Sequence, residues 1–191
     1  MFLVGIICFI YEVNYQIKTK NITLLIKKYI TPGIILYAVM LLFFLIHLKD
    51  QRFIHYDNFS HWGVIVKSFI MNKAVFNANE SIITFNCYPP GSALFIFYFS
   101  NLVGVSESLA LYSQIIVILS ALLPLFSFSS FEILDKSLVI NRKMKGIIFL
   151  LTTLISLMLL NGPSNINDLL VDTLLSAVAI GLFASIYFYF E

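Results

Sequence analysis

Long apolar runs alternate with short polar stretches along the chain. Four runs come near the length of about 20 residues that a helix needs to cross a bilayer. They are residues 31–48, 108–128, 147–161 and 167–190, of which the third is the shortest. Pro32 stands where a first helical turn tolerates proline, and Pro124 lies near the far end of the second run. The pattern predicts an all-α fold, a polytopic transmembrane helix bundle.

The polar segment 49–93 separates the first two runs. Over residues 57–72 its apolar side chains recur at three- and four-residue spacing, which predicts an amphipathic juxtamembrane helix. A helix of this kind lies along the membrane surface with its aromatic side down. A short apolar stretch over 94–104 predicts a further helix that dips into the outer leaflet. The expected apolar face of the surface helix consists of Phe59, Trp62, Val66, Phe69 and Ile70.

Composition supports a membrane protein. The chain has 191 residues, of which 60% are hydrophobic and 12% charged, whereas a soluble domain carries about 25% charged residues. The net charge is only +2, and no cluster of Lys and Arg is interleaved with aromatic residues, so nucleic acid is not expected as a partner. The two cysteines, Cys8 and Cys87, lack the spacing of metal ligands.

The distribution of lysine and arginine predicts the orientation. These residues cluster before the first and third runs, so both clusters should be cytoplasmic, and segments 49–93 and 161–168 should lie together outside. We therefore expect a multi-pass protein of a bacterial plasma membrane with a single membrane domain over residues 1–191. The small number of spans predicts a piece of a larger bundle that is inactive alone. The clusters are Lys18, Lys20, Lys27 and Lys28, and Lys136, Arg142, Lys143 and Lys145.

The string YDNFSHWG, residues 56–63, gathers polar and ring side chains just after the first run. Asp57 and His61 are four residues apart, so we expect them to share a helical face that borders water. Asp57 also stands near the expected start of the helix, where negative charge is favoured. Simpler interpretations stay open: Asp57 as a helix cap, His61 as an ordinary interfacial residue, and Lys67 as a lysine that snorkels to the surface.

A second string, Tyr88-Pro89-Pro90-Gly91, forms a rigid entry to the next apolar segment. Together with the string Asp57–Gly63, it resembles the GT-C class of integral-membrane glycosyltransferases, which includes protein mannosyltransferases and lipid A aminoarabinose transferases. The resemblance covers roughly residues 30–190 in layout, and only the two strings are specific. It implies transfer of a sugar from a polyprenyl-phosphate donor to a glycan, lipid or protein acceptor on the outer face.

The resemblance also implies roles for individual residues. The first external acid of the class, here Asp57, deprotonates the acceptor hydroxyl or helps bind a divalent cation. The class commonly has two adjacent acids, whereas this chain has Asn58 in the second place, so metal binding is left open. A single carboxylate can still act as a general base. The expected substrate-binding residues, some of them candidates to bind the leaving phosphate, are Arg52, Asn58, His61, Lys67 and Tyr88.

Two acids stand at the start of the last run, Asp168 and Asp172, and their spacing places them on one helical face. We expect Asp168 to be an N-terminal helix acid and Asp172 to bind substrate, because an acid within a span normally faces a polar cavity. The alternative function is a transporter or flippase-like subunit without covalent chemistry, which predicts charges deep in several spans. A third interpretation is a structural membrane protein.

Overall fold

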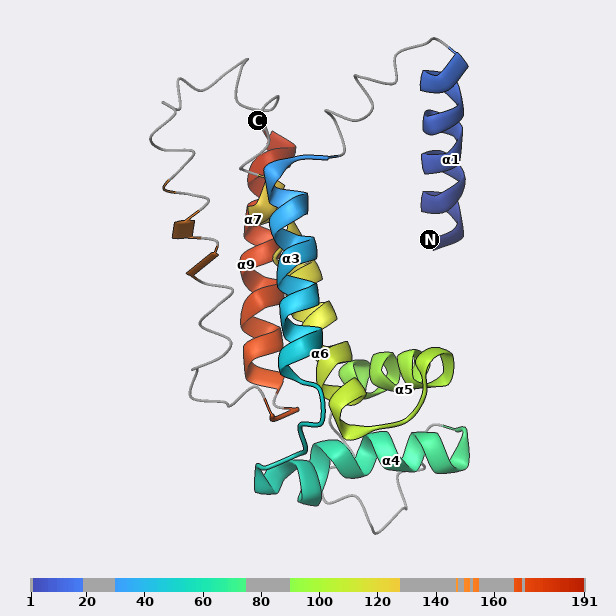
Figure 1. Ribbon diagram of the computed structural model, residues 1–191, viewed down its shortest axis with the longest axis vertical. Helices are drawn as coiled ribbons and strands as arrows, with labels where there is room; N and C mark the ends of the chain where they lie inside the picture. The colour runs from blue at the N-terminus through green and yellow to red at the C-terminus, as the bar shows by residue number, and fades with distance from the viewer. Residues whose placement is uncertain are drawn as a thin grey trace.

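The computed structural model describes residues 2–18, 30–74, 90–127, 147, 150–151, 153–154, 167–169 and 171–190. All regular structure in these residues is helical, which confirms the all-α prediction. Helices α3 (Pro32–His47), α6 (Glu107–Ala121) and α9 (Val171–Phe190) stand upright, and two shorter helices lie across one end (Figure 1). Helix α6 packs against both α3 and α9 and is therefore the centre of the bundle.

Local chemistry sets the bounds of the upright helices. Thr31 and Ser106 cap α3 and α6, because each hydroxyl oxygen accepts a hydrogen bond from the backbone N–H three residues on, at 3.3 and 3.1 Å. Pro32 occupies the first turn of α3, as predicted. Helix α6 gives way to the short α7 (Leu123–Ser127), since Pro124 has no N–H to continue the hydrogen-bond ladder.

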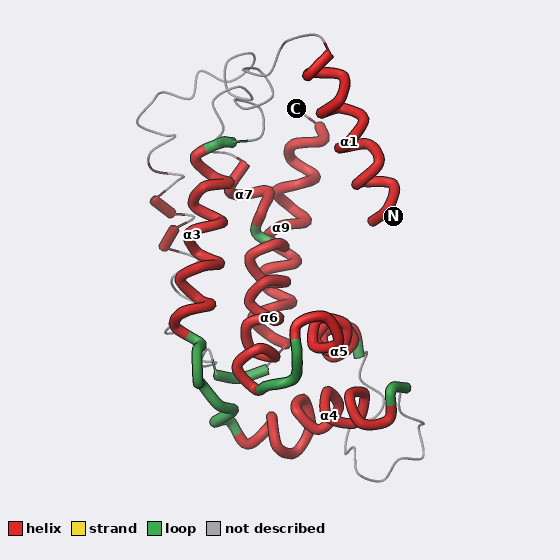
Figure 2. Tube along the Cα trace, turned by 45° about the vertical axis from the view of Figure 1, so that its right-hand side comes forward, coloured by secondary structure: helices red, strands yellow, loops and turns green. Residues whose placement is uncertain are grey.

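The predicted surface helix is present, but it begins with a π-helical turn, η1 (Asn58–Trp62), before α4 (Gly63–Asn72). Figure 2 shows this pair lying across the end of the bundle beside α5 (Gly91–Val103). Helix α5 contains the short helix that the sequence predicted over 94–104. It leads through residues 104–106 into α6, and the two helices are bent by 120° at this break.

The residues of the predicted apolar face do not share one environment. Val66 and Phe69 are buried in the protein core and not turned to a membrane surface, Trp62 is partly buried against that core, and Phe59 is 61% exposed. The polar Asn58 and His61 are buried in its place. A π turn closes its hydrogen bond over one more residue than an α turn, so the side chains before α4 take a different rotational setting from the one that an uninterrupted helix gives.

A continuous apolar core joins the crosswise helices to the upright ones. Phe69 of α4 meets Phe97 of α5 edge to face, with 6.2 Å between the ring centroids. Burial of one large apolar side chain contributes roughly 1.5–3 kcal/mol, so this core fixes α4 against the bundle. Its largest fully buried side chains are Phe44, Leu48, Ile65, Phe69, Ile96, Leu111, Ile118, Leu119, Leu122 and Phe126.

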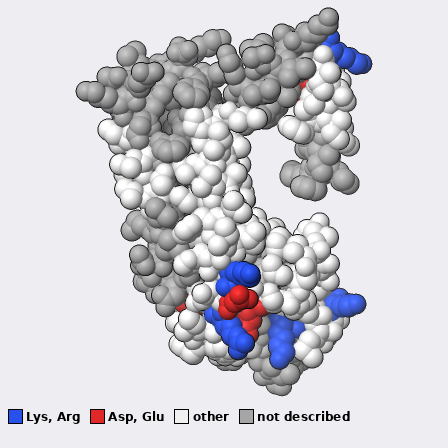
Figure 3. Space-filling model, in the orientation of Figure 1, with Lys and Arg blue, Asp and Glu red and all other residues white. Residues whose placement is uncertain are grey.

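The outer surface of the upright helices is also apolar. Large side chains such as Ile46 and Phe183 are well exposed, the latter by 73%. In the view of Figure 3, acidic and basic side chains gather at the end that carries α4, and an uncharged band covers the upright helices. Among the described residues, no single helix combines the length and apolar character of a membrane span. The bent pair of α5 and α6 passes that test only when the two are taken together.

Helix α1 (Phe2–Lys18) lies to one side of the upright helices in Figure 1.

Some sequence predictions fall on residues that the structure does not describe. Of the third predicted span, only residues 147, 150–151 and 153–154 are described. Tyr88 and Pro89 lie outside the described residues, because the described chain resumes at Pro90. Of the basic residues on which the predicted orientation rests, Lys18 is described. Those outside the described part are Lys20, Lys27, Lys28, Lys136, Arg142, Lys143 and Lys145.

Candidate functional site

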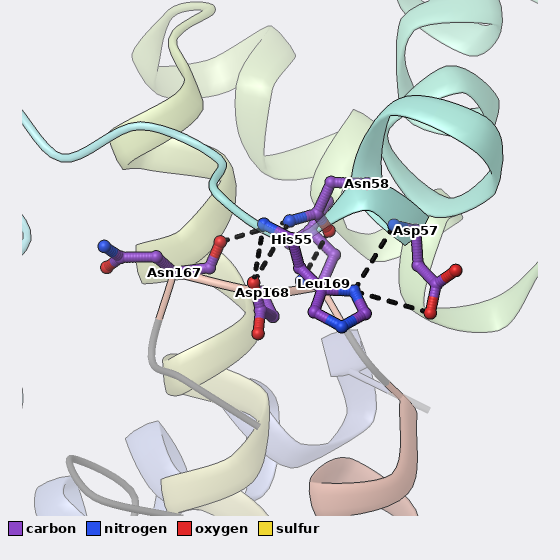
Figure 4. A network of polar contacts seen from close by, with 6 residues as sticks. All are labelled: His55, Asp57, Asn58, Asn167, Asp168 and Leu169. Atoms are coloured by element: carbon purple, nitrogen blue, oxygen red, sulfur yellow. Dashed lines mark hydrogen bonds and ion pairs between the residues drawn. The ribbon is translucent and has the colours of Figure 1, made fainter. Parts of the chain in front are cut away.

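The turn around Asp57 meets the segment that leads into α9 (Figure 4). The backbone N–H of His55 donates to Oδ1 of Asp168 at 3.2 Å, and Nδ2 of Asn58 donates to the carbonyl oxygen of Asn167 at 3.1 Å. These partners lie more than 100 positions apart in the sequence. The contact places residues 55–58 and 167–169 side by side at one end of the bundle.

Asn58 is the centre of this contact and is only 1% exposed. Its Oδ1 accepts a hydrogen bond from the N–H of Leu169 at 2.8 Å, and its Nδ2 also lies 3.4 Å from Oδ1 of Asp168. Both polar atoms of the amide are therefore occupied by the protein itself. This placement contradicts the predicted role of Asn58 in binding substrate.

Asp168 is 5% exposed and accepts hydrogen bonds from the backbone of His55 and the side chain of Asn58 through a single oxygen. From α6, Nε2 of Gln114 approaches the carbonyl oxygen of Asp168 at 3.4 Å. The residue stands just before α9, where the helix dipole favours negative charge. A buried acid thus joins the turn, α6 and the entry to α9.

Asp172 has a different environment from Asp168. Helix α9 begins at Val171, so Asp168 precedes the helix and Asp172 lies in its first turn. Asp168 is buried and Asp172 is exposed. The predicted common face is therefore wrong, because it assumed that the helix begins before Asp168. The structure does not bring Asp172 to the contact around Asn58.

Asp57 keeps an accessible carboxylate, with 30% of its side chain exposed. Its Oδ2 lies 3.4 Å from Nδ1 of His55, and the same nitrogen accepts a hydrogen bond from the Asp57 N–H at 3.3 Å. The carboxylate makes no capping bond to the helix, which removes the interpretation of Asp57 as a cap alone. A hydrogen bond to Asp57 and the charge of its carboxylate raise the pKa of the exposed Tyr56 above 10.0.

His61 is buried, with 4% of its surface exposed, and its ring lies edge-on to Trp62 at 4.4 Å between centroids. Burial lowers the pKa of His61 below 6.5, and the charge of Asp57 offsets part of this effect. A neutral, buried imidazole is unsuited to binding a phosphate in water. The predicted water-facing stripe of Asp57 and His61 is wrong, because the π turn directs His61 inward.

The lowered pKa of His61 predicts that the protein loses stability in acid. The unfolded state binds a proton at His61 more readily than the folded state. The contribution of His61 to stability is therefore fully present above about pH 6.5 and is lost as the pH falls through that value toward the lower folded pKa. Thermal unfolding in detergent at pH 7.5 and pH 5 should show this loss, at about 2–4 °C per kcal/mol for a chain of this size.

Substitution of single histidines assigns this effect to its source. His61→Phe keeps a ring but cannot be protonated, so the difference between the midpoints at the two pH values should shrink. His47→Gln removes an exposed histidine that stacks on Phe43 and should leave the difference unchanged. An unaltered pH difference in His61→Phe contradicts the assignment.

A groove of about 680 Å³ runs between α4 and the corner where α5 meets α6. Its walls are mainly apolar. Its lining includes Asn58 and Phe59, which directly follow Asp57 in the chain. Lys67 and Glu107 place opposite charges on the walls. Lys67 is exposed, so it is available to a ligand, as the sequence predicted.

Two backbone features shape the end of the groove nearest Asp57. A Cβ atom at Gly63 would overlap the carbonyl oxygen of Asn58 and come within 3.2 Å of the Phe53 ring, so the π turn requires glycine here. The N–H of Phe53 donates to Oε2 of Glu107 at 2.8 Å, which ties the preceding loop to the first turn of α6. Arg52, the neighbour of Phe53, is exposed, in keeping with its predicted availability to substrate.

Sequence reasoning missed the contacts that hold the turn around Asp57 but recognised the region in which they lie. His55 stands one residue before the string that drew attention, and Asp168 ends the segment expected on the same side. Gln114 lies in a predicted span, where nothing in the sequence distinguishes it from a packing residue. Among the described residues, no group of three or more His, Cys, Asp and Glu side chains is arranged to hold a metal ion.

Comparisons with known proteins add no relative. No protein-family model, no curated protein and no solved structure matches this chain. The function must therefore be argued from the site itself.

Proposed function

We propose that this protein is a membrane-embedded glycosyltransferase of the GT-C type. It transfers a sugar from a polyprenyl-phosphate donor to a glycan, lipid or protein acceptor at the outer face of a bacterial plasma membrane. Asp57 serves as the general base for the acceptor hydroxyl, and the exposed cations Lys67 and Arg52 meet the leaving phosphate.

The apolar exterior supports the membrane part of the proposal. The upright helices expose large aliphatic and aromatic side chains, as lipid-facing helices do. Within the described parts of α3, α6, α7 and α9, Glu107 and Asp172 are the only Asp, Glu, Lys or Arg residues, and both lie in first turns. This distribution does not favour the transporter alternative, which requires charges deep in the spans.

The single observation that carries the proposal is an accessible carboxylate in the turn whose next two residues line an amphipathic groove. Asp57 adjoins Asn58 and Phe59, which line a groove of about 680 Å³. Pockets that bind small molecules have about 300–1,000 Å³ and mostly apolar walls with a few polar groups. A lipid chain fits the apolar walls, and the exposed ammonium group of Lys67 suits a phosphate.

In the proposed reaction, the acceptor hydroxyl attacks the anomeric carbon of the donor sugar. Its proton passes to a carboxylate oxygen of Asp57, a new glycosidic bond forms, and the carbon–oxygen bond to the lipid phosphate breaks. The bonding electrons leave with the phosphate oxygen, where Lys67 and Arg52 balance the charge. General-base catalysis of this kind contributes about 10²–10⁴-fold to a rate.

Native membranes provide the direct test. Membranes from cells that make this protein should move radiolabel from a polyprenyl-phosphate sugar to an acceptor, and membranes from cells that lack its gene should not. A panel of donors that differ in the sugar identifies the substrate. If label instead crosses the bilayer with its bond to phosphate intact, the transporter alternative is correct and the proposal is wrong.

A further inference from the structure

His55 and Asn58, one on each side of Asp57 in the turn, are tied to the same distant segment. His55 donates its backbone N–H to Asp168, and Asn58 exchanges two hydrogen bonds with the main chain on either side of Asp168 (Figure 4). The N–H of Asp57 itself is bound to Nδ1 of His55. The backbone of Asp57 is thus held on both sides while its carboxylate stays accessible.

The tying segment is itself held by two other parts of the protein. Gln114 of α6 reaches the carbonyl oxygen of Asp168 at 3.4 Å, and Nδ2 of Asn167 donates to Oε1 of Gln51 at 3.1 Å. The segment then leads directly into α9. The turn is therefore held in place by α6, at the centre of the bundle, and not only by its own helix.

We propose that Asn58 and Asp168 are positioning residues for Asp57, an inference that rests on the proposed function. The Asn58 amide acts like a short piece of backbone, because it accepts from Leu169 and donates to Asn167. A carboxylate at position 58 can accept but cannot donate, and an aliphatic side chain can do neither. Misplacement of a reacting group by about 1 Å costs about 10²-fold in rate.

Asn58→Asp gives the sharpest test because protonation restores what the substitution removes. At pH 7.5 the new carboxylate faces the Asn167 carbonyl oxygen and the Asp168 carboxylate, and both disfavour its charge. Its pKa should be raised, so at pH 5 a larger share of it is protonated and donates as the amide does. The other charged or titratable neighbours are His55, Asp57 and His61 on its turn, and Lys67 and Glu107 on the groove.

Sugar transfer by the full protein in membranes should follow this chemistry. At pH 7.5 Asn58→Asp should lower kcat at least tenfold relative to wild type, with the KM for the donor changed less than threefold. At pH 5 the deficit relative to wild type at the same pH should shrink at least threefold. Asn58→Leu should be impaired at both pH values. Wild-type kcat in Asn58→Asp at pH 7.5, or a deficit independent of pH, overturns the inference.

Asp168 and a control amide complete the design. Asp168→Asn keeps an oxygen that can accept from His55 and should lose less kcat than Asp168→Leu. Asn101→Leu removes an exposed amide that donates to the Phe97 carbonyl oxygen within α5, so it should behave as wild type. Equal effects of the two Asp168 substitutions, or an effect of Asn101→Leu as large as that of Asn58→Leu, contradict a specific positioning role.

A distance measurement separates failure of this inference from failure of the proposed function. Nitroxide labels at Asp57→Cys and Asp172→Cys, with Cys8 and Cys87 replaced by serine, report the distance between the turn and α9. The distribution should be narrow in this background and should broaden when Asn58→Leu is added, but not with Asn101→Leu. If wild-type membranes transfer no sugar but the broadening occurs in the labelled protein, the proposed function fails and the positioning contact stands. An unchanged distribution overturns the positioning contact.

Discussion

Asp57→Asn is expected to lower sugar transfer at least about 100-fold, because an amide of the same shape cannot accept the proton of the acceptor hydroxyl. The fold should be kept. The Asp57 side chain is 30% exposed, and its Oδ2 lies 3.4 Å from Nδ1 of His55. Even a charged pair at such an exposed site is worth only about 0–1 kcal/mol. The donor KM should change little, since the groove walls are untouched. Radiolabel transfer in native membranes, with protein level measured by immunoblot, gives both quantities.

Asp172→Asn is the matched control for this experiment. It makes the same chemical change on an exposed acid in the first turn of α9, away from the contact around Asn58. We expect it to transfer sugar at the wild-type rate. Full activity of Asp57→Asn removes Asp57 as the base. If both substitutions abolish transfer, a general requirement for surface charge is the better explanation.

Gly181→Ala is expected to destabilise the protein, although it adds only one methyl group. A Cβ atom at position 181 of α9 would overlap the carbonyl oxygen of Ala121 at the end of α6. That obstacle is backbone and cannot rotate away, so the helices must separate. Overpacking of this kind costs about 1–3 kcal/mol. Thermal or denaturant unfolding in detergent should show the loss, and Gly181→Leu should show a larger one.

Two further variants identify the cause. Gly91→Ala adds the same methyl group at the start of α5, where nothing lies within 4 Å, and should be neutral or slightly stabilising. Ala121→Gly combined with Gly181→Ala should remain destabilised, because trimming the Ala121 side chain leaves its carbonyl oxygen in place. Recovery of full stability in the double variant contradicts a clash with the backbone.

The helix positions could be predicted because each depends on neighbouring residues. The apolar run at 31–48 contains α3, and the run at 108–128 covers α7 and all of α6 except its first residue, with the break beside Pro124. Caps and prolines act over one turn, so a linear sequence carries enough information to place them. Periodicity also identified α4, although Val66 and Phe69 of its apolar face pack into the protein core and not onto a membrane surface as predicted.

The orientation of the site could not be predicted in the same way. The spacing of Asp57 and His61 suggested one water-facing stripe, and the π turn separated them into an accessible acid and a buried imidazole. The turn depends on Gly63, whose missing side chain leaves room for the Asn58 carbonyl oxygen. One glycine in a helical pattern does not predict a π turn, because most such glycines only lower the helix propensity of the segment.

The amino-acid sequence alone determined that this is a helical, unusually apolar protein with its polar chemistry concentrated near residues 49–93. Hydrophobic spacing and charge content can be read from neighbouring residues, without knowing which distant residues pack against them. Only the tertiary structure decided that Asn58 is a buried support, that Asp57 is accessible, and that Asp168 rather than Asp172 meets them. Those outcomes depend on contacts across more than 100 positions of sequence, which form when α9 packs against α6.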